Sequence, residues 1–214
     1  MRKKYIDTIN EIEKRMVDMA LLAEKSLDKT MDSLMKRDIE KSKIIIEDDV
    51  EIDNMEIEIE KSIVKLLTLE NPKARDFRRV ASVFKIITDL ERIGDLAADI
   101  AEISIGIGDE DFIKPLIDLP RMYEITKEML SSSIKAYKRN DKNLALEISK
   151  KDDLVDDLHF QINEELIHML SNDIDLKDQA MKLMYISRYL ERIADHVTNI
   201  CERIIYIETN KITS

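Results

Sequence analysis

Turn-forming residues are scarce in this sequence, which holds only three Gly and three Pro in 214 residues. Because these residues end helices and form most tight turns, the segments between them must be long. Apolar residues recur at every third or fourth position through almost the whole chain, as on one face of a helix. The alternating run at 56–60 resembles a strand, but it is too short to outweigh the helical pattern around it. We therefore expect an all-α protein.

The periodicity predicts six helices in two groups of three. Apolar stripes run from Ile9 to Leu34, from Ile45 to Leu66 and from Val80 to Ala101, and the pattern then returns near 119–138, 141–170 and 176–208. Asp38 is placed to cap the second helix, and Asn71-Pro72 to end it. The remaining turn residues, apart from Gly94, fall between residues 106 and 120. We expect a first three-helix repeat at 1–108, a linker at 109–119 and a second repeat at 120–214.

The second half is a divergent copy of the first. The sequence LERIGD at 90–95 returns as LERIAD at 190–195, and KRD at 36–38 returns as KRN at 138–140. The spacing of Asp49 and Asp53 returns in Asp152 and Asp156. Because the matches keep the same order, we expect tandem three-helix bundles produced by internal duplication and related by a pseudo-twofold axis.

Each copy carries an acidic ladder on its third helix. Glu91, Asp95 and Asp99 lie four residues apart and so share one face, and the second copy gives Glu191, Asp195 and Asn199. Like charges at this spacing destabilise a helix by roughly 0.2–0.5 kcal/mol per pair. Beside the ladders, the small residues Gly94 and Ala194 would let a neighbouring helix approach closely.

That neighbour is expected to be the middle helix, whose segment 47–60 carries eight acidic residues and no basic one. Carboxylates of two helices that converge on one groove need a cation, and oxygen ligands favour hard ions such as magnesium, manganese, calcium or ferric iron over zinc. The alternative is that these acids form a solvated surface. The candidate ligands are Glu91, Asp95, Asp99, Glu191, Asp195, Asn199, Asp49, Asp53, Asp152 and Asp156.

Other polar side chains are weaker candidates. His196 follows Asp195 directly and so points about 100° away from the ladder. Arg92 and Arg192 could bind phosphate, but an arginine beside an acidic ladder more often forms a salt bridge. His159, His168 and the single cysteine, Cys201, fit structural positions better than ligand positions.

Charge and composition exclude several classes of function. A net charge of −11 opposes binding to nucleic acid. One cysteine allows neither an internal disulfide nor a thiolate zinc cluster, which suits the reducing cytoplasm. The sequence shows no signal peptide and no stretch long enough to span a bilayer. It also shows no glycine-rich phosphate loop and no nucleophile–base pattern, so we do not expect an enzyme.

The paired motifs resemble those of the PhoU family. LERIGD and LERIAD look like its twice-repeated signature, and Asp49/Asp53 with Asp152/Asp156 resemble its second signature, within a likeness that spans about residues 5–210. The resemblance implies a cytoplasmic protein that often dimerises and that acts as a negative regulator of phosphate uptake and of the phosphate-starvation response. The implied partners are the ATPase subunit of the phosphate ABC transporter and a sensor histidine kinase.

The resemblance also bears on the metal sites. Some family members bind metal clusters through Glu/Asp-x-x-x-Asp motifs, which here are Glu91/Asp95 and Glu191/Asp195, so iron, magnesium, manganese or zinc are the implied cofactors. The chain departs from the family pattern at Asn199, where an acid is expected, and at Ala194, where Gly is expected. An asparagine brings no charge, so the second site is expected to hold fewer or weaker ions.

Three alternatives stay open at this point. The chain could be a PhoU-like partner of a Pit-type phosphate permease. It could be a metal-storage or di-iron bundle, although such sites use a Glu-x-x-His pair that the ladders lack. It could also be a purely structural helical scaffold, which would give the duplicated ladders no role.

Overall fold

The computed structural model describes residues 2–69 and 73–210, and within them it contains helices and no strand. The expected all-α class is therefore confirmed. The elements are α1 (Arg2–Lys36), α2 (Ile39–Asp48), α3 (Val50–Leu69), α4 (Ala74–Ile107), α5 (Asp118–Arg139), α6 (Lys142–Ser149), α7 (Asp152–Asn172), the short 3₁₀ helix η1 (Ile174–Leu176) and α8 (Lys177–Thr209).

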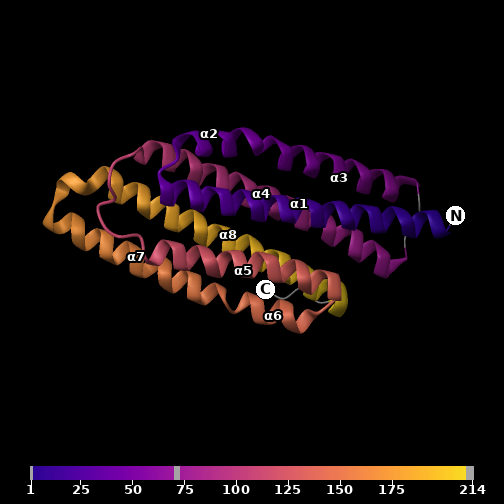
Figure 1. Cartoon of the computed structure of the whole chain (residues 1–214). Coiled ribbons are helices and arrows are strands. Elements are labelled where there is room, and N and C mark those ends of the chain that lie inside the picture. The colour runs from indigo at the N-terminus through magenta and orange to yellow at the C-terminus, as the bar shows by residue number, and fades with distance from the viewer. Residues whose placement is uncertain (1, 70–72, 211–214) are drawn as a thin grey trace.

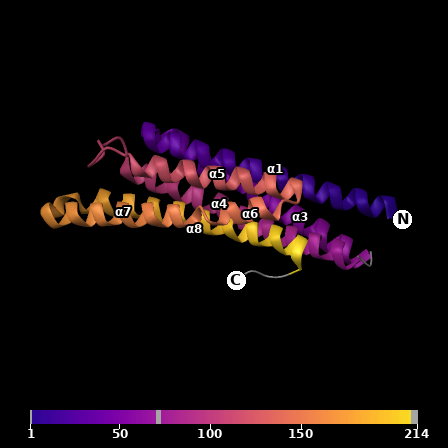
Figure 2. The same ribbon diagram turned by 90° about the horizontal axis from the view of Figure 1, so that it is seen from below.

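The two halves of the chain form two elongated bundles that lie side by side, α1–α4 in one and α5–α8 in the other (Figure 1). In both views the helices run along the length of the molecule (Figure 2). The bundles meet mainly where α4 packs on α8 and where α1 packs on α5. Buried apolar side chains of both halves form one continuous core. The two repeats are thus held together by the same hydrophobic burial that holds each of them.

A buried polar cluster also joins the halves. Glu13 on α1 accepts hydrogen bonds from Arg79 on α4 and from the Tyr137 hydroxyl on α5, each at 2.8 Å. Glu13 and Tyr137 are both buried, so each polar group needs the partner that the other supplies. Farther along the same two helices, Asp28 on α1 accepts from Tyr123 at 2.6 Å and from Lys127 at 2.9 Å, both on α5.

The expectation of one middle helix per half was wrong, because that helix is broken in both halves. The first break falls at Asp49, between α2 and α3, and the second at 150–151, between α6 and α7. Locally the backbone makes tighter i→i+3 hydrogen bonds, from Ile52 N to Asp49 O at 2.9 Å and from Leu154 N to Lys151 O at 3.0 Å. The first break falls at the first aspartate of an Asp-x-x-x-Asp pair, Asp49, and the second falls directly before the first aspartate of the other pair, Asp152.

The loop before each middle helix follows one pattern in both halves. Arg37 and Asn140 adopt left-handed backbone angles, with φ of 57° and 51°. Asp38 and Asp141 come next and cap α2 and α6, accepting from backbone N–H groups at 3.0–3.1 Å. The predicted cap at Asp38 is confirmed. The repeat register at this loop is 103 residues, so Asp38 corresponds to Asp141, whereas the sequence match had paired it with Asn140.

The connection between the halves runs from Gly108 to Ile117 and is fastened to α8. The side chain of Gln179 accepts from Ile113 N at 2.6 Å and donates to Asp111 O at 3.2 Å. Gly108 has a φ of 75°, a conformation that favours glycine at the end of a helix. Asn71-Pro72, which were expected to end the middle helix, lie outside the described residues.

No helix in the described part of the chain combines the length and the hydropathy that crossing a bilayer requires.

Candidate metal centres

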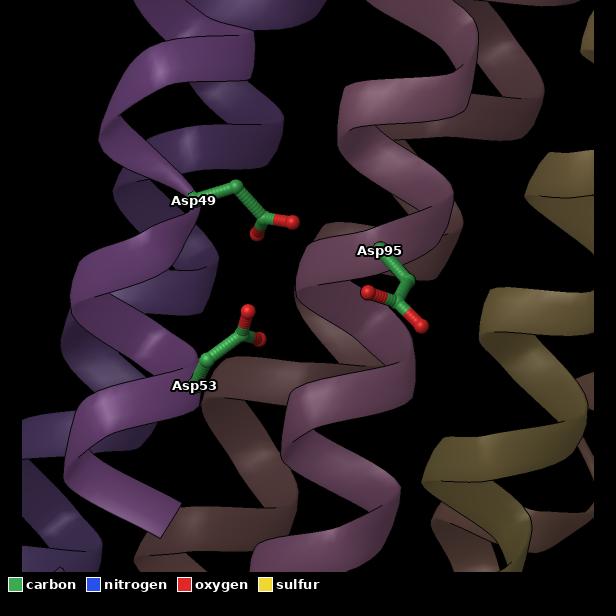
Figure 3. Close-up of side chains that lie close together, drawn as sticks. All are labelled: Asp49, Asp53 and Asp95. Carbon is green, nitrogen blue, oxygen red and sulfur yellow. The ribbon is translucent and has the colours of Figure 1, made fainter. Parts of the chain in front are cut away.

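The first candidate site lies where the α2–α3 junction faces α4. Asp49 ends α2, Asp53 lies in the first turn of α3, and Asp95 projects from α4. In Figure 3, Asp49 and Asp53 extend from one helix toward the helix that carries Asp95. One carboxylate oxygen of each residue lies within 4.8 Å of the other two, and all three residues are half-buried. The fold therefore gathers three acids that are up to 46 positions apart in the sequence.

Gly94 makes this close approach possible. A Cβ atom at this position would lie 2.8 Å from Asp49 Oδ1 and 2.8 Å from Ile52 Cδ1, too close for either contact. The expectation that a small residue admits a neighbouring helix is therefore confirmed for Gly94. Ala194 holds the corresponding place in the second half and is fully buried.

The acids of the first site raise one another's pKa values. Burial, followed by the charges of Asp53, Asp95 and Asp99, raises the pKa of Asp49 to about 6. Burial and the charge of Asp95 raise the pKa of Glu91 to about 7, although Arg92 opposes this shift. Burial and Asp95 also raise the pKa of Asp99. The site therefore carries more negative charge than its surroundings stabilise.

The second half repeats this arrangement with four acids. Burial, then Asp195, Asp156 and Glu191, raise the pKa of Asp152 to about 6. Burial raises the pKa of Glu191 and of Asp195, and in each case a neighbouring carboxylate adds to the shift. The four residues lie on facing sides of α7 and α8. Among the described residues, the close convergence of three carboxylates is found in the first half and not here.

Four buried carboxylate oxygens in the two sites have no hydrogen-bond partner among the described residues. They are Asp49 Oδ1 and Glu91 Oε2 in the first half, and Asp152 Oδ1 and Glu191 Oε2 in the second. Asp49 corresponds to Asp152 and Glu91 to Glu191, so the same two atoms lack a hydrogen bond in each copy, although Arg92 Nε forms an ion pair with Glu91 Oε2 at 3.3 Å. A buried acceptor without a partner costs about 1–3 kcal/mol, and more when it is charged. The repetition of these atoms points to a ligand that both copies accommodate.

At the edge of each site an arginine forms an ion pair with a ladder carboxylate. Arg92 donates to Asp95 Oδ2 at 2.9 Å, and its Nε lies 3.3 Å from Glu91 Oε2. In the second half the arginine that pairs with Glu191 is Arg188, which the sequence analysis missed. Its i,i+3 spacing from Glu191 is the signal that could have found it. Arg92 thus forms a salt bridge.

Asn199 is bound to the other half of the molecule. Its Nδ2 donates to Asp89 Oδ1 on α4 at 3.3 Å, and the same oxygen lies 3.0 Å from His196 Nδ1. His196 therefore faces α4, whereas the sequence had indicated only that it points away from Asp195. Asp99 faces other groups: Arg192 on α8 opposes the rise in its pKa, and its own charge raises the pKa of Tyr189 on α8 and of Asp49. Asn199 therefore differs from Asp99 in its neighbours as well as in its charge.

The remaining candidates divide between surface and interior. Most acids of segment 47–60 are exposed, so the solvated-surface reading holds for Glu47, Asp48, Glu51, Glu58 and Glu60. His159 bonds to Ser187 at 3.0 Å, and His168 is exposed. Cys201 is buried, and its burial raises the thiol pKa to about 12, as fits a packing residue.

The donor atoms at both sites suit a hard cation. They are carboxylate oxygens, and they outnumber the nearby arginines. A bound ion would give the unsatisfied oxygens a partner and would remove the repulsion that raises the pKa values. The arrangement is therefore chemically able to bind metal at the molecular surface.

Comparison with known proteins identifies the family. The family model described as the PhoU domain matches residues 16–104 and matches again at residues 119–204. The chain belongs to the PhoU family. Both matches include an acidic ladder, so the internal repeat is a repeat of the PhoU domain.

Curated PhoU proteins match this chain over nearly its full length. The phosphate-specific transport system accessory protein PhoU homolog of Clostridium acetobutylicum is 35% identical, over 98% of this chain and 96% of that protein. The homolog of Aquifex aeolicus is also 35% identical, over 98% of this chain and 95% of that protein.

Solved PhoU structures share the fold. The crystal structure of the phosphate transport system regulatory protein PhoU from Streptococcus pneumoniae matches with a TM-score of 0.92 and 27% identity, over 98% of this chain and 99% of that one. PhoU from Pseudomonas aeruginosa gives a TM-score of 0.93 and 27% identity, over 97% and 100%. The tandem arrangement of two helical repeats is thus that of PhoU.

Proposed function

We propose that this chain is a non-enzymatic accessory protein of phosphate transport that binds metal ions at its two acidic sites and regulates by docking onto partner proteins. The names of its relatives, which describe accessory and regulatory proteins of a phosphate transport system, support the role. The observation that carries the metal-binding part is the pair of unsatisfied carboxylate oxygens of Asp49 and Asp152, which hold the same place in the two copies.

At the first site, Asp49, Asp53 and Asp95 would hold the ion, with Glu91 and Asp99 beside them. At the second, Asp152, Asp156, Glu191 and Asp195 would do so. A bound cation supplies positive charge at an otherwise repulsive surface, and magnesium, manganese and iron fit oxygen donors better than zinc. With Asn199 in place of an acid, the second site should bind more weakly than the first.

The partners we propose are the ATPase subunit of the phosphate ABC transporter and a sensor histidine kinase, met in the cytoplasm by a homodimer that acts as a negative regulator. The charge distribution supports docking, because two acidic sites on one molecule steer complementary surfaces toward them. The protein would then regulate phosphate uptake by binding or releasing these partners at its acidic surfaces, without turnover of a substrate.

Metal binding is tested by calorimetric titration of chelator-treated protein with Mn²⁺ and Mg²⁺. We expect saturable binding that Asp49→Asn with Asp95→Asn weakens at least about tenfold. The control is Glu11→Gln, which removes one exposed charge from α1 and should leave binding unchanged. Equal titration curves for the wild type and the Asp49/Asp95 variant would show that these acids form only a solvated surface.

A further inference from the structure

A groove lies between α7 and α8, next to the second acidic site. An open groove of about 330 Å³ runs between these helices, lined by His159, Asn163, Met181, Met184, Tyr185 and Arg188. His159 and Asn163 follow Asp156 at helical spacing, so the groove continues the line of the second acidic site. Arg188 forms an ion pair with Glu191. Arg188, the one arginine among the lining residues, is therefore already paired with a carboxylate at the acidic end of the groove.

Exposed apolar side chains border this groove on both helices. On α7, Phe160 is 66% exposed and Ile167 is 51% exposed, and both are neighbours of Asn163 on the helix surface. On α8, Met181 is 49% exposed and Tyr185 is 53% exposed. Burial and the charge of Arg188 lower the pKa of His159, although Asp156 opposes this shift. Apolar side chains thus dominate the α8 side of the groove, and on α7 they alternate with the polar side chains of His159, Asn163 and the exposed Glu164.

The first half of the molecule does not repeat this groove. The positions that correspond to His159 and Asn163 are Glu56 and Glu60, and the position of Tyr185 is taken by Lys85. In addition, Thr88 on α4 donates to Glu56 on α3 at 3.0 Å, whereas in the second half His159 on α7 bonds to Ser187 on α8 at 3.0 Å. The duplication preserved the acidic site in both copies but left an apolar groove in one.

Charge along the groove is strongly one-sided. Where α7 begins, Asp153, Asp156 and Asp157 are exposed, and Asp195 is exposed on α8. An apolar groove between two helices is also the shape into which a third helix packs. The matching occupant has apolar residues at helical spacing along its middle and positive charge at one end.

We propose that this groove is the docking site for a basic amphipathic helix of a partner protein. Its apolar face covers Phe160, Ile167, Met181 and Tyr185, and its lysine or arginine end meets the acids at the start of α7. The inference rests on the docking role proposed above, and it does not depend on metal binding at either site.

The test uses a fluorescein-labelled synthetic peptide with leucines at positions i, i+3, i+4 and i+7 and four lysines at one end. Binding is followed by fluorescence anisotropy with the full chain. The key variant is Phe160→Gln with Ile167→Gln, which replaces exposed side chains and leaves the core intact. Its matched control is Ile57→Gln with Val64→Gln, the equivalent exposed positions on α3. We expect the first pair to weaken binding at least about tenfold and the second less than about twofold.

Two further comparisons separate the apolar and ionic parts. Asp153→Asn with Asp157→Asn should weaken binding about threefold at low salt and less at high salt. A peptide of the same composition with its leucines scattered should bind at least about tenfold more weakly.

Several outcomes would overturn the proposal. One is a dissociation constant weaker than about 1 mM for the wild type. Another is equal weakening by the α7 and α3 variants, or equal binding of the scattered peptide, since either means non-specific attraction. A dimer in sedimentation experiments that Phe160→Gln with Ile167→Gln dissociates would assign the groove to a second copy of this chain. Metal titration of the same variants distinguishes the two claims: peptide binding without metal binding refutes only the metal role.

Discussion

At the scale of single residues, the first site depends on two neighbours that face each other across a helix contact. Asp49 supplies an unsatisfied carboxylate oxygen, and Gly94 supplies the space for it. The sequence alone indicated both residues, one by its place in an acidic segment and the other by its size. What it could not give is how little space is left at Gly94, where an added Cβ atom would lie 2.8 Å from Asp49 Oδ1, because that space depends on how two helices pack.

We predict that Gly94→Ala destabilises the protein. Alanine gains about 1 kcal/mol in helix propensity, but the new methyl group meets Asp49 and Ile52, and overpacking costs about 1–3 kcal/mol. The control is Gly106→Ala on the same helix, where the nearest atom is the flexible end of Lys182 at 3.6 Å. Urea unfolding should show a lower midpoint for the first variant and an equal or higher one for the second. A higher urea midpoint for Gly94→Ala would mean that α4 and the α2–α3 junction are not in close contact there.

We also predict that metal-free protein loses stability as the pH rises from about 4 to about 7. Asp49 has a folded pKa of about 6 against an ordinary 3.8, so within this window the folded state holds a proton that the unfolded state has released. Raising the pH therefore favours unfolding, and Glu91 and Asp152 act in the same direction. His159, whose pKa is lowered, acts in the opposite direction.

The comparison that isolates Asp49 is the wild type against Asp49→Asn. The variant should lose less stability across this pH range in thermal or urea unfolding, while Asp7→Asn, an exposed residue on α1, should behave as the wild type does. Parallel curves for the wild type and Asp49→Asn would show that this carboxyl is not perturbed.

At the scale of helices, most of the secondary structure could be predicted because its signals are local. Apolar periodicity and the cap at Asp38 depend on residues within a few positions of each other. The breaks at Asp49 and at 150–151 could not be predicted, because no Gly or Pro marks them and the periodicity continues on both sides. At each break the backbone forms an i→i+3 hydrogen bond over one turn. The breaks bear on the candidate sites because Asp49 lies at the first and Asp152 directly follows the second.

At the scale of the whole molecule, the duplication was visible in the sequence, but the contacts between its halves were not. Asp89 and His196 lie 107 positions apart, and no periodic pattern relates them. The same holds for Glu13 and Tyr137. Only the packing of α4 on α8 and of α1 on α5 brings such residues together.

If the protein docks onto a partner, removing metal should change how much partner it captures. The direction of that change distinguishes two mechanisms. If a bound ion bridges the acidic sites to a partner, chelator should weaken capture of the transporter ATPase subunit in a pull-down. If the bare acids attract a basic surface, chelator should strengthen it. An Asp152→Asn with Glu191→Gln variant should abolish the chelator effect at the second site, and an unchanged effect would assign it to the first.

The central claim is that both acidic sites hold metal, and anomalous scattering from crystals soaked in Mn²⁺ tests it most directly. The account predicts one peak among Asp49, Asp53 and Asp95 and a second, of equal or lower occupancy, beside Asp152 and Glu191. Crystals of Asp49→Asn with Asp95→Asn should keep only the second peak. Manganese-soaked crystals without a peak at either cluster would contradict the claim, and the repeated unsatisfied oxygens would then need another explanation.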